Sequence, residues 1–139
     1  MKQLIYISIA EPNLSTEALQ SILDTAQRNN AAHAVTGMLL YNTMFFCQVL
    51  EGPEESIALI YKKLALDARH HDLLVYLNRH THARAFGEWS MAYINGANPE
   101  IHAMLARYGM ENGFLPHSID GLKLLELLLE SRRFATLHV

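Results

Sequence analysis

Three polar side chains stand in apolar surroundings along the sequence, and the chemistry they offer is directional hydrogen bonding. Gln48 lies in the strand-like stretch FFCQVLEGP at positions 45–53, where an unpaired buried amide would cost about 1–3 kcal/mol. Tyr6 lies in another apolar stretch, and its hydroxyl needs a partner if it is buried. Asn30 is the second residue of an Asn–Asn pair that closes a predicted helix, where asparagine is a common C-cap.

The elements that must position these side chains follow from the spacing of apolar residues. Runs rich in β-branched and aromatic residues predict strands, and apolar residues at i, i+3, i+4 and i+7 predict helices. The predicted elements, in chain order, are a strand at 3–9, a helix at 15–29, strands at 34–41 and 45–51, a helix from Pro53 to about Asp67, and strands at 73–78 and 88–94. This order predicts an α+β fold, a ferredoxin-like βαββαββ sheet with two helices on one face.

The predicted topology brings two of the polar side chains together. The first and third strands of a ferredoxin-like sheet are central neighbours, so Tyr6 and Gln48 can face the same side, towards the two helices. From the residues alone, a Tyr–Gln hydrogen bond inside the core and a ligand bound by these groups are equally good interpretations.

The last third of the chain is predicted to be helical. Pro99 opens a helix to about Tyr108, the turn-rich GMENGFLP follows, and a leucine-rich helix runs from Ser118 to about Arg133. The leucines of that helix cover too much of its circumference for a narrow stripe. We expect it to pack on the open face of the sheet, on a partner, or on both.

Composition and motifs exclude several classes of function. The 139 residues carry a formal net charge of -3, which is not the basic excess typical of nucleic-acid binding. The apolar runs fall short of the roughly 18 residues that span a bilayer, and no signal peptide is visible. Cys47, the only cysteine, is interpreted as a buried small hydrophobe, and His80 and His82 lack the carboxylates that would support a metal site. We expect a cytoplasmic protein without a metal centre and without nucleic-acid or membrane partners.

Five segments occur in a recognisable order. They are LIYIS, AQRNNAAHAVTGMLLY, FFCQVLEGP, the DARHH run at 67–71 and FGEWSMAY. In this combination the chain resembles the BLUF family, the sensors of blue light using FAD, over about residues 3–94. The resemblance implies a flavin-binding domain at 1–95 and a helical extension at 96–139 that packs on the same domain.

The resemblance also implies roles for individual residues. FAD is the expected cofactor, with FMN as the alternative, and the flavin ring would lie between the two helices over the sheet. Ile22 and Leu64 would flank the ring, and Asn30 would bond its carbonyl edge. Gln48 would join the flavin to Tyr6. The full implied cofactor-binding set is Ser8, Ile22, Asn30, Gln48, Lys63, Leu64, Asp67 and His71. Of these, Lys63, Asp67 and His71 would lie near the ribityl and phosphate end of the flavin.

The implied activity is light signalling without enzymatic turnover. Tyr6 would donate an electron and then a proton through Gln48, which is left rotated or tautomerised. A last strand carrying Trp89 and Met91 would pass the change to the helical extension, and output would go through an unidentified signalling protein or a homo-oligomer. Two alternatives remain at this stage: a flavin-dependent redox enzyme, and a light-inert ferredoxin-like interaction module.

Overall fold

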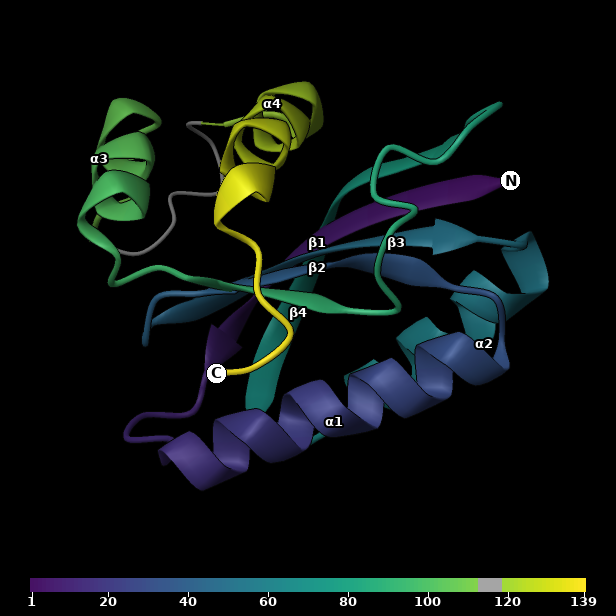
Figure 1. Ribbon diagram of the computed structural model, residues 1–139, viewed down its shortest axis with the longest axis horizontal. Helices are drawn as coiled ribbons and strands as arrows, with labels where there is room; N and C mark the ends of the chain where they lie inside the picture. The colour runs from purple at the N-terminus through teal and green to yellow at the C-terminus, as the bar shows by residue number, and fades with distance from the viewer. Residues whose placement is uncertain (113–118) are drawn as a thin grey trace.

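A computed structural model describes residues 1–112 and 119–139, which form a sheet covered on both faces by helices (Figure 1). The elements in chain order are β1 (Lys2–Ala10), α1 (Thr16–Ala32), β2 (Thr36–Tyr41), β3 (Phe45–Gly52), α2 (Glu54–Ala65), β4 (His70–His80), β5 (Ala92–Asn95), α3 (Pro99–Arg107), α4 (Gly121–Ser131) and the 3₁₀ turn η1 (Arg132–Phe134). This confirms the predicted βαββαββ order and the α+β class. None of the helices in the described ranges has the length and apolar character needed to cross a bilayer.

The five strands lie in the order β4-β1-β3-β2-β5. β1 and β3 are antiparallel central neighbours, and Tyr6 stands directly opposite Gln48 in their register. β5 pairs with β2 in parallel and lies at one edge of the sheet, while β4 lies at the other. The predicted adjacency of the first and third strands is therefore confirmed.

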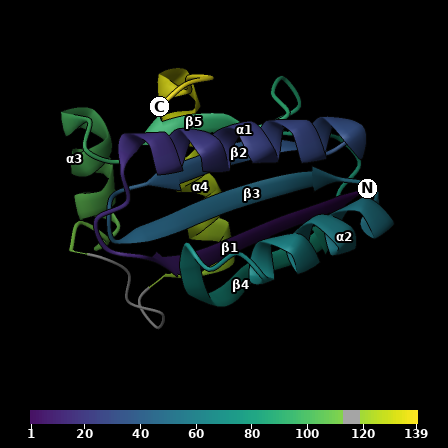
Figure 2. The same ribbon diagram turned by 90° about the horizontal axis from the view of Figure 1, so that it is seen from below.

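α1 and α2 cover one face of the sheet, and β3 and β1 are visible between them (Figure 2). Ser15 caps α1 by accepting a hydrogen bond from the Ala18 amide at 3.0 Å, as its position predicted. The apolar stripes of both helices face the sheet, so that Leu19 and Leu23 of α1 and Ile57 and Ile60 of α2 are buried. The apolar residues at helical spacing thus form the core layer between these two helices and the sheet.

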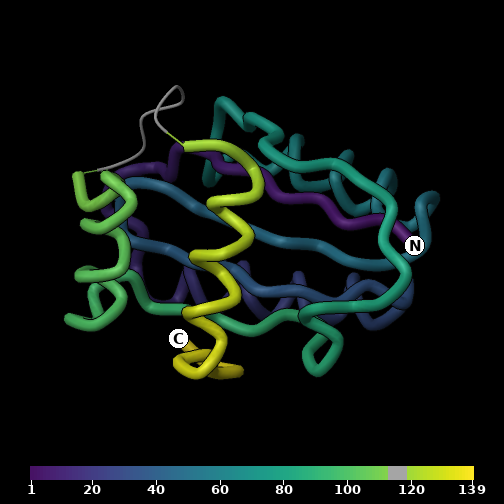
Figure 3. The backbone as a smooth tube through the Cα atoms, turned by 90° about the horizontal axis from the view of Figure 1, so that it is seen from above, coloured from purple at the N-terminus to yellow at the C-terminus, as the bar shows by residue number. Residues whose placement is uncertain are grey.

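α4 covers the opposite face and crosses the strands from the β4 side to the β5 side (Figure 3). Four of its leucines are buried against the sheet: Leu124, Leu125, Leu127 and Leu128. A Cβ added at Gly121, the first residue of the helix, would lie 2.1 Å from the backbone oxygen of Tyr76, so glycine allows α4 to touch β4. Packing on the sheet accounts for most of the leucine-rich face, and Leu122 stays exposed at 57%.

Several element boundaries differ from the predicted ones. The last strand is Ala92–Asn95 and not 88–94, so Trp89 and Met91 lie in the loop before it. β4 extends in both directions beyond 73–78. α1 continues to Ala32 and His33 caps it, which places Asn30 inside the last turn of the helix. The predicted start of α4 at Ser118 lies outside the described residues, and the 95/96 domain boundary stays a prediction.

Candidate functional site

A hydrogen-bonded pair at the centre of the sheet forms the core of the candidate site. The Tyr6 hydroxyl donates to Gln48 Oε1 at 2.5 Å, and the two side chains are only 1% and 2% exposed. Gln48 Nε2 in turn contacts Met91 Sδ at 3.4 Å, and Met91 is fully buried. The Gln48 amide therefore has a partner at each of its two ends.

The Tyr6 phenol stays protonated in this environment. Burial raises the pKa of Tyr6 well above its ordinary value, and the neighbouring Cys47 and Tyr61 raise it further. The Tyr61 ring meets the Tyr6 ring edge-on, with centroids 5.9 Å apart. Tyr6 is therefore a hydrogen-bond donor to Gln48 across the physiological pH range.

Asn30 links α1 to the loop that carries Met91. Its side chain is 1% exposed, and its Nδ2 donates to the Ser90 backbone oxygen at 2.7 Å. Because Nδ2 is engaged, Oδ1 is the end of the amide that remains to accept a bond from a ligand. Asn30 is thus a buried polar group and not the helix cap that its sequence position suggested.

A cavity of about 100 Å³ lies between α1, α2 and the sheet, with Tyr6, Gln48 and Asn30 in its wall. Six of the residues implied as cofactor-binding line the cavity: Ile22, Asn30, Gln48, Lys63, Leu64 and Asp67. The remaining lining residues are Thr25, Ala26, Asn29, Leu39, Phe46, Ile60, Arg69 and His70. The cavity is thus an apolar slot with a few buried amide groups on one side and charged groups towards the end of α2.

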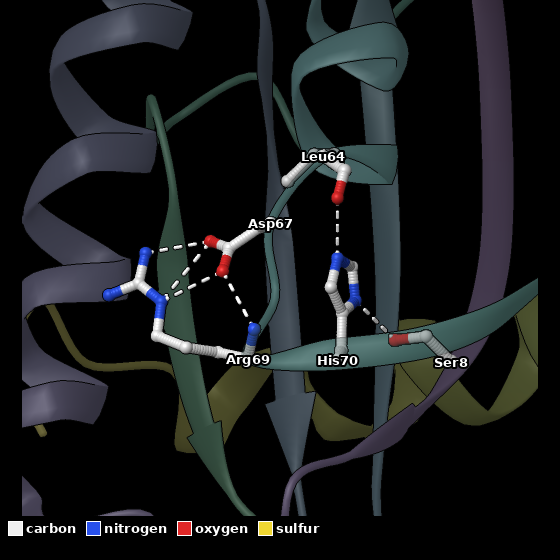
Figure 4. A network of polar contacts seen from close by, with 5 residues as sticks. All are labelled: Ser8, Leu64, Asp67, Arg69 and His70. Atoms are coloured by element: carbon white, nitrogen blue, oxygen red, sulfur yellow. Dashed lines mark hydrogen bonds and ion pairs between the residues drawn. The ribbon is translucent and has the colours of Figure 1, made fainter.

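Polar contacts at the charged end of the cavity join Asp67 to Arg69 and hold the ring of His70 (Figure 4). Arg69 binds Asp67 through Nε and Nη2, with the shortest distance, 2.7 Å, between Nη2 and Oδ2. The hydrogen bond from Arg69 holds the pKa of the Asp67 carboxyl below its usual value. The sequence interpretation did not include Arg69, although the cation two residues after Asp67 was visible.

His70, and not His71, reaches the cavity. The His70 ring lies between Ser8 Oγ, 2.7 Å from Nδ1, and the Leu64 carbonyl, 2.6 Å from Nε2. The His71 side chain is 51% exposed and contacts Asp72. Ser8 is buried and bonds His70, but neither Ser8 nor His71 lines the cavity.

The two candidate signalling residues lie on opposite faces of the sheet. Met91 belongs to the apolar cluster under α1 and α2, whereas the half-buried Trp89 packs against the cluster under α4. The Trp89 backbone oxygen accepts a bond from Gly37 at 3.1 Å, which ties the loop to β2. The sequence did not reveal these directions, because alternation along a strand does not apply to a loop.

The loop before Met91 is fixed by a fully buried carboxylate, Glu51 at the end of β3. Glu51 Oε1 accepts from the Phe86 amide at 2.6 Å, and Oε2 accepts from the Ala85 amide at 3.0 Å and from Gln3 Nε2 at 2.8 Å. Arg84 adds bonds from its Nη1 to the Glu51 carbonyl and to Thr36 Oγ1, both at 2.8 Å. The loop that presents Met91 to Gln48 is therefore anchored from β3 as well as from Asn30.

Comparison with known proteins identifies the family. The family model described as sensors of blue-light using FAD matches residues 1–92, which is about two thirds of the chain. The chain therefore belongs to the BLUF family.

Individual relatives agree with this assignment. The chain is 36% identical over 88 residues to the blue light- and temperature-regulated antirepressor BluF of Escherichia coli (strain K12), covering 63% of this chain and 22% of that protein. It is 38% identical over 89 residues to the photoactivated adenylate cyclase subunit beta of Euglena longa, covering 63% of this chain and 10% of that protein. The chain thus spans about a fifth or less of the length of these relatives.

Two of the similar solved structures match this chain over nearly their whole length. The photo-activated state of BlsA has a TM-score of 0.81 and 27% identity, with 94% of this chain and 93% of that chain covered. The dark state of BlrB, titled a BLUF protein, has a TM-score of 0.78 and 25% identity, with 94% and 96% covered. The similarity therefore includes the α3 and α4 region as well as the sheet.

The residues present fit a flavin. An apolar slot suits a flat ring, and the buried amides of Asn30 and Gln48 in its wall suit the polar edge of such a ring. Lys63 and Arg69 in the same wall supply cations for a phosphate. Among the residues that the structure describes, no cluster of His, Cys, Asp or Glu could hold a metal ion.

Proposed function

We propose that the chain is a blue-light photoreceptor that binds a flavin non-covalently and signals through the hydrogen bonds of Tyr6 and Gln48. The observation that carries this proposal is the 2.5 Å bond from the Tyr6 hydroxyl to Gln48 Oε1 in the wall of the cavity. A buried phenol and a buried amide in direct contact beside a ligand slot are the parts that a hydrogen-bond switch needs. The protein would act as a sensor and not as an enzyme.

FAD is the proposed ligand. Asn30 and Gln48 would bond the polar edge of the ring, and Ile22 and Leu64 would pack against it. Lys63 and Asp67, together with Arg69 and His70, would face the ribityl and phosphate end. The family's description as sensors using FAD supports FAD over FMN.

When bound, the flavin supplies the absorption of blue light and, in its excited state, the oxidising power. Tyr6 is an oxidisable phenol in the wall of the slot, and an oxidised phenol releases its proton far more readily than a neutral one. Gln48 Oε1 is the acceptor that this proton meets. The same amide has Nε2 against Met91 Sδ, so exchange of its two ends would change the contact with Met91 at almost no cost in volume.

Output from this chain is proposed to go to a downstream signalling protein or to rearrangement of a homo-oligomer. The relatives are named as an antirepressor and as cyclase subunits, which supports outputs that differ between members of the family. We also propose a cytoplasmic location, which the free and buried Cys47 thiol fits.

Absorption spectroscopy tests the proposal. The purified protein should contain flavin, and blue light should produce a small, reversible red shift of its visible absorption. Gln48→Leu and Tyr6→Phe should bind flavin but fail to form the shifted state. Tyr93→Phe is the matched control, because Tyr93 is a buried tyrosine on the same face that does not line the cavity. A normal photocycle in Gln48→Leu would contradict the mechanism.

A further inference from the structure

The chain after α4 passes around the β5 edge of the sheet. In Figure 1 this segment descends from the α4 layer towards α1. Thr136 pairs with Tyr93 in antiparallel fashion, with Tyr93 N donating to Thr136 O at 2.7 Å and Thr136 N donating to Tyr93 O at 2.9 Å. The segment 135–139 therefore fills part of the outer edge of β5.

Polar contacts hold this segment, and its apolar side chains are only partly buried. Thr136 to Val139 are exposed, and Leu137 and Val139 are 48% and 38% exposed. Gln27 Nε2 donates to the Leu137 carbonyl at 3.1 Å, and Gln20 Oε1 accepts from the Val139 amide at 2.9 Å. Each of these bonds can be replaced by a bond to water or to another chain, so the segment can leave the edge without unfolding the core.

One side-chain amide connects the segment to the candidate switch. Gln27 Nε2 donates to the Met91 carbonyl at 3.1 Å as well as to the Leu137 carbonyl. Met91 Sδ is in turn the contact of Gln48 Nε2. A change at Gln48 that moves Met91 therefore alters the Gln27 bond that also holds the segment.

We propose that the outer edge of β5 is a docking site for an extended segment of a partner protein, which replaces residues 135–137 opposite Tyr93 when Met91 and Gln27 release them. The occupant is a protein strand because the edge presents one donor and one acceptor on the Tyr93 backbone. An antiparallel main chain satisfies both, as Thr136 does here. The docking site at this edge does not depend on the proposed function, whereas its control by light rests on it.

Amide hydrogen exchange at Tyr93 tests the release. In the flavin-loaded protein in the dark, the Tyr93 amide should exchange slowly, and continuous blue light should raise its rate at least tenfold. Gln27→Leu should produce the same rise in the dark, without light. Gln20→Leu is the matched control: it removes the contact with Val139 and a surface bond to Asp24 but leaves both Gln27 bonds in place, so the Tyr93 rate should stay within twofold of the original.

A peptide tests the docking. The probe is the synthetic hexapeptide FATLHV, residues 134–139, added to isotope-labelled Gln27→Leu protein in the dark. Shifted signals from β5 and restored protection of Tyr93 are expected, whereas FAPLHV, which lacks the donor, should have no effect. Absence of any response to FATLHV, or an unchanged Tyr93 rate in Gln27→Leu, overturns the docking site. If the flavin red shift forms but the Tyr93 rate does not change, control by light is overturned while the proposed function stands. If no red shift forms, the proposed function fails and the Gln27→Leu arm still decides the docking site.

Discussion

Replacing Glu51 by glutamine should destabilise the protein although the shape of the side chain is preserved. The Glu51 carboxylate is fully buried and accepts three hydrogen bonds. Phe86 N donates to Oε1, and Ala85 N and Gln3 Nε2 donate to Oε2. A glutamine has one acceptor oxygen. With that oxygen in the Oε2 position, the glutamine keeps the bonds from Ala85 N and Gln3 Nε2. Its NH₂ group then faces the Phe86 amide, so that two donors meet and that bond is lost.

The expected loss can be worked from these three bonds. One charge-assisted bond is lost outright, which costs about 1.5–3 kcal/mol, and the other two become bonds between neutral groups. The free energy of unfolding should therefore fall by about 3 kcal/mol. For a domain of this size that lowers Tm by roughly 10 °C and leaves it folded.

Urea denaturation of the flavin-loaded protein in the dark, followed by circular dichroism, measures this change. Glu54→Gln is the matched control, because Glu54 is an exposed glutamate whose ion pair with Lys2, at 3.2 Å, lies on the surface. Such a pair contributes at most about 1 kcal/mol. If Glu51→Gln changed the unfolding free energy by no more than Glu54→Gln, the anchoring role assigned to Glu51 would be refuted.

Three further outcomes are expected. Because Arg69 lowers the pKa of Asp67 in the folded protein, their ion pair stabilises the protein above about pH 4 and loses that effect as the pH falls further. Arg69→Gln should therefore reduce the loss of unfolding free energy at acid pH, and identical stability–pH profiles of the variant and the original protein would argue against the pair. Gly121→Ala should lower the unfolding free energy by about 1–3 kcal/mol, since the new Cβ would press on the Tyr76 carbonyl, and an unchanged urea midpoint would show that α4 can shift freely. Cys47 should resist alkylation until the protein unfolds, because it is fully buried and burial raises its pKa to about 12; rapid labelling of the folded protein would disprove this.

The central pair of the site could be predicted because strand periodicity and topology both determine it. Tyr6 and Gln48 lie in long, regular strands, so their faces follow from alternation and their adjacency from the strand order. Ile22 and Leu64 likewise follow from the helical spacing that aims them inward. These residues line the cavity as the sequence suggested.

The parts that could not be predicted depend on irregular backbone. His70 and His71 point to opposite sides of β4, but that choice is readable only if the strand is known to begin at His70 and not at 73. Trp89 and Met91 lie in a loop, where no periodicity assigns their faces. The donors that Glu51 binds are backbone amides, which leave no mark in the sequence.

The contacts of the site join residues that are far apart in the chain, and this ties the site to folding. Tyr6 and Gln48 are 42 positions apart, Gln48 and Met91 are 43 apart, and Asn30 and Ser90 are 60 apart. Such contacts form only once the sheet has closed, because each requires the entropy of a long loop to be lost first. A partly folded chain therefore has no complete flavin site. Any ligand that binds there binds the native state alone, and its affinity adds directly to the stability of the whole sheet.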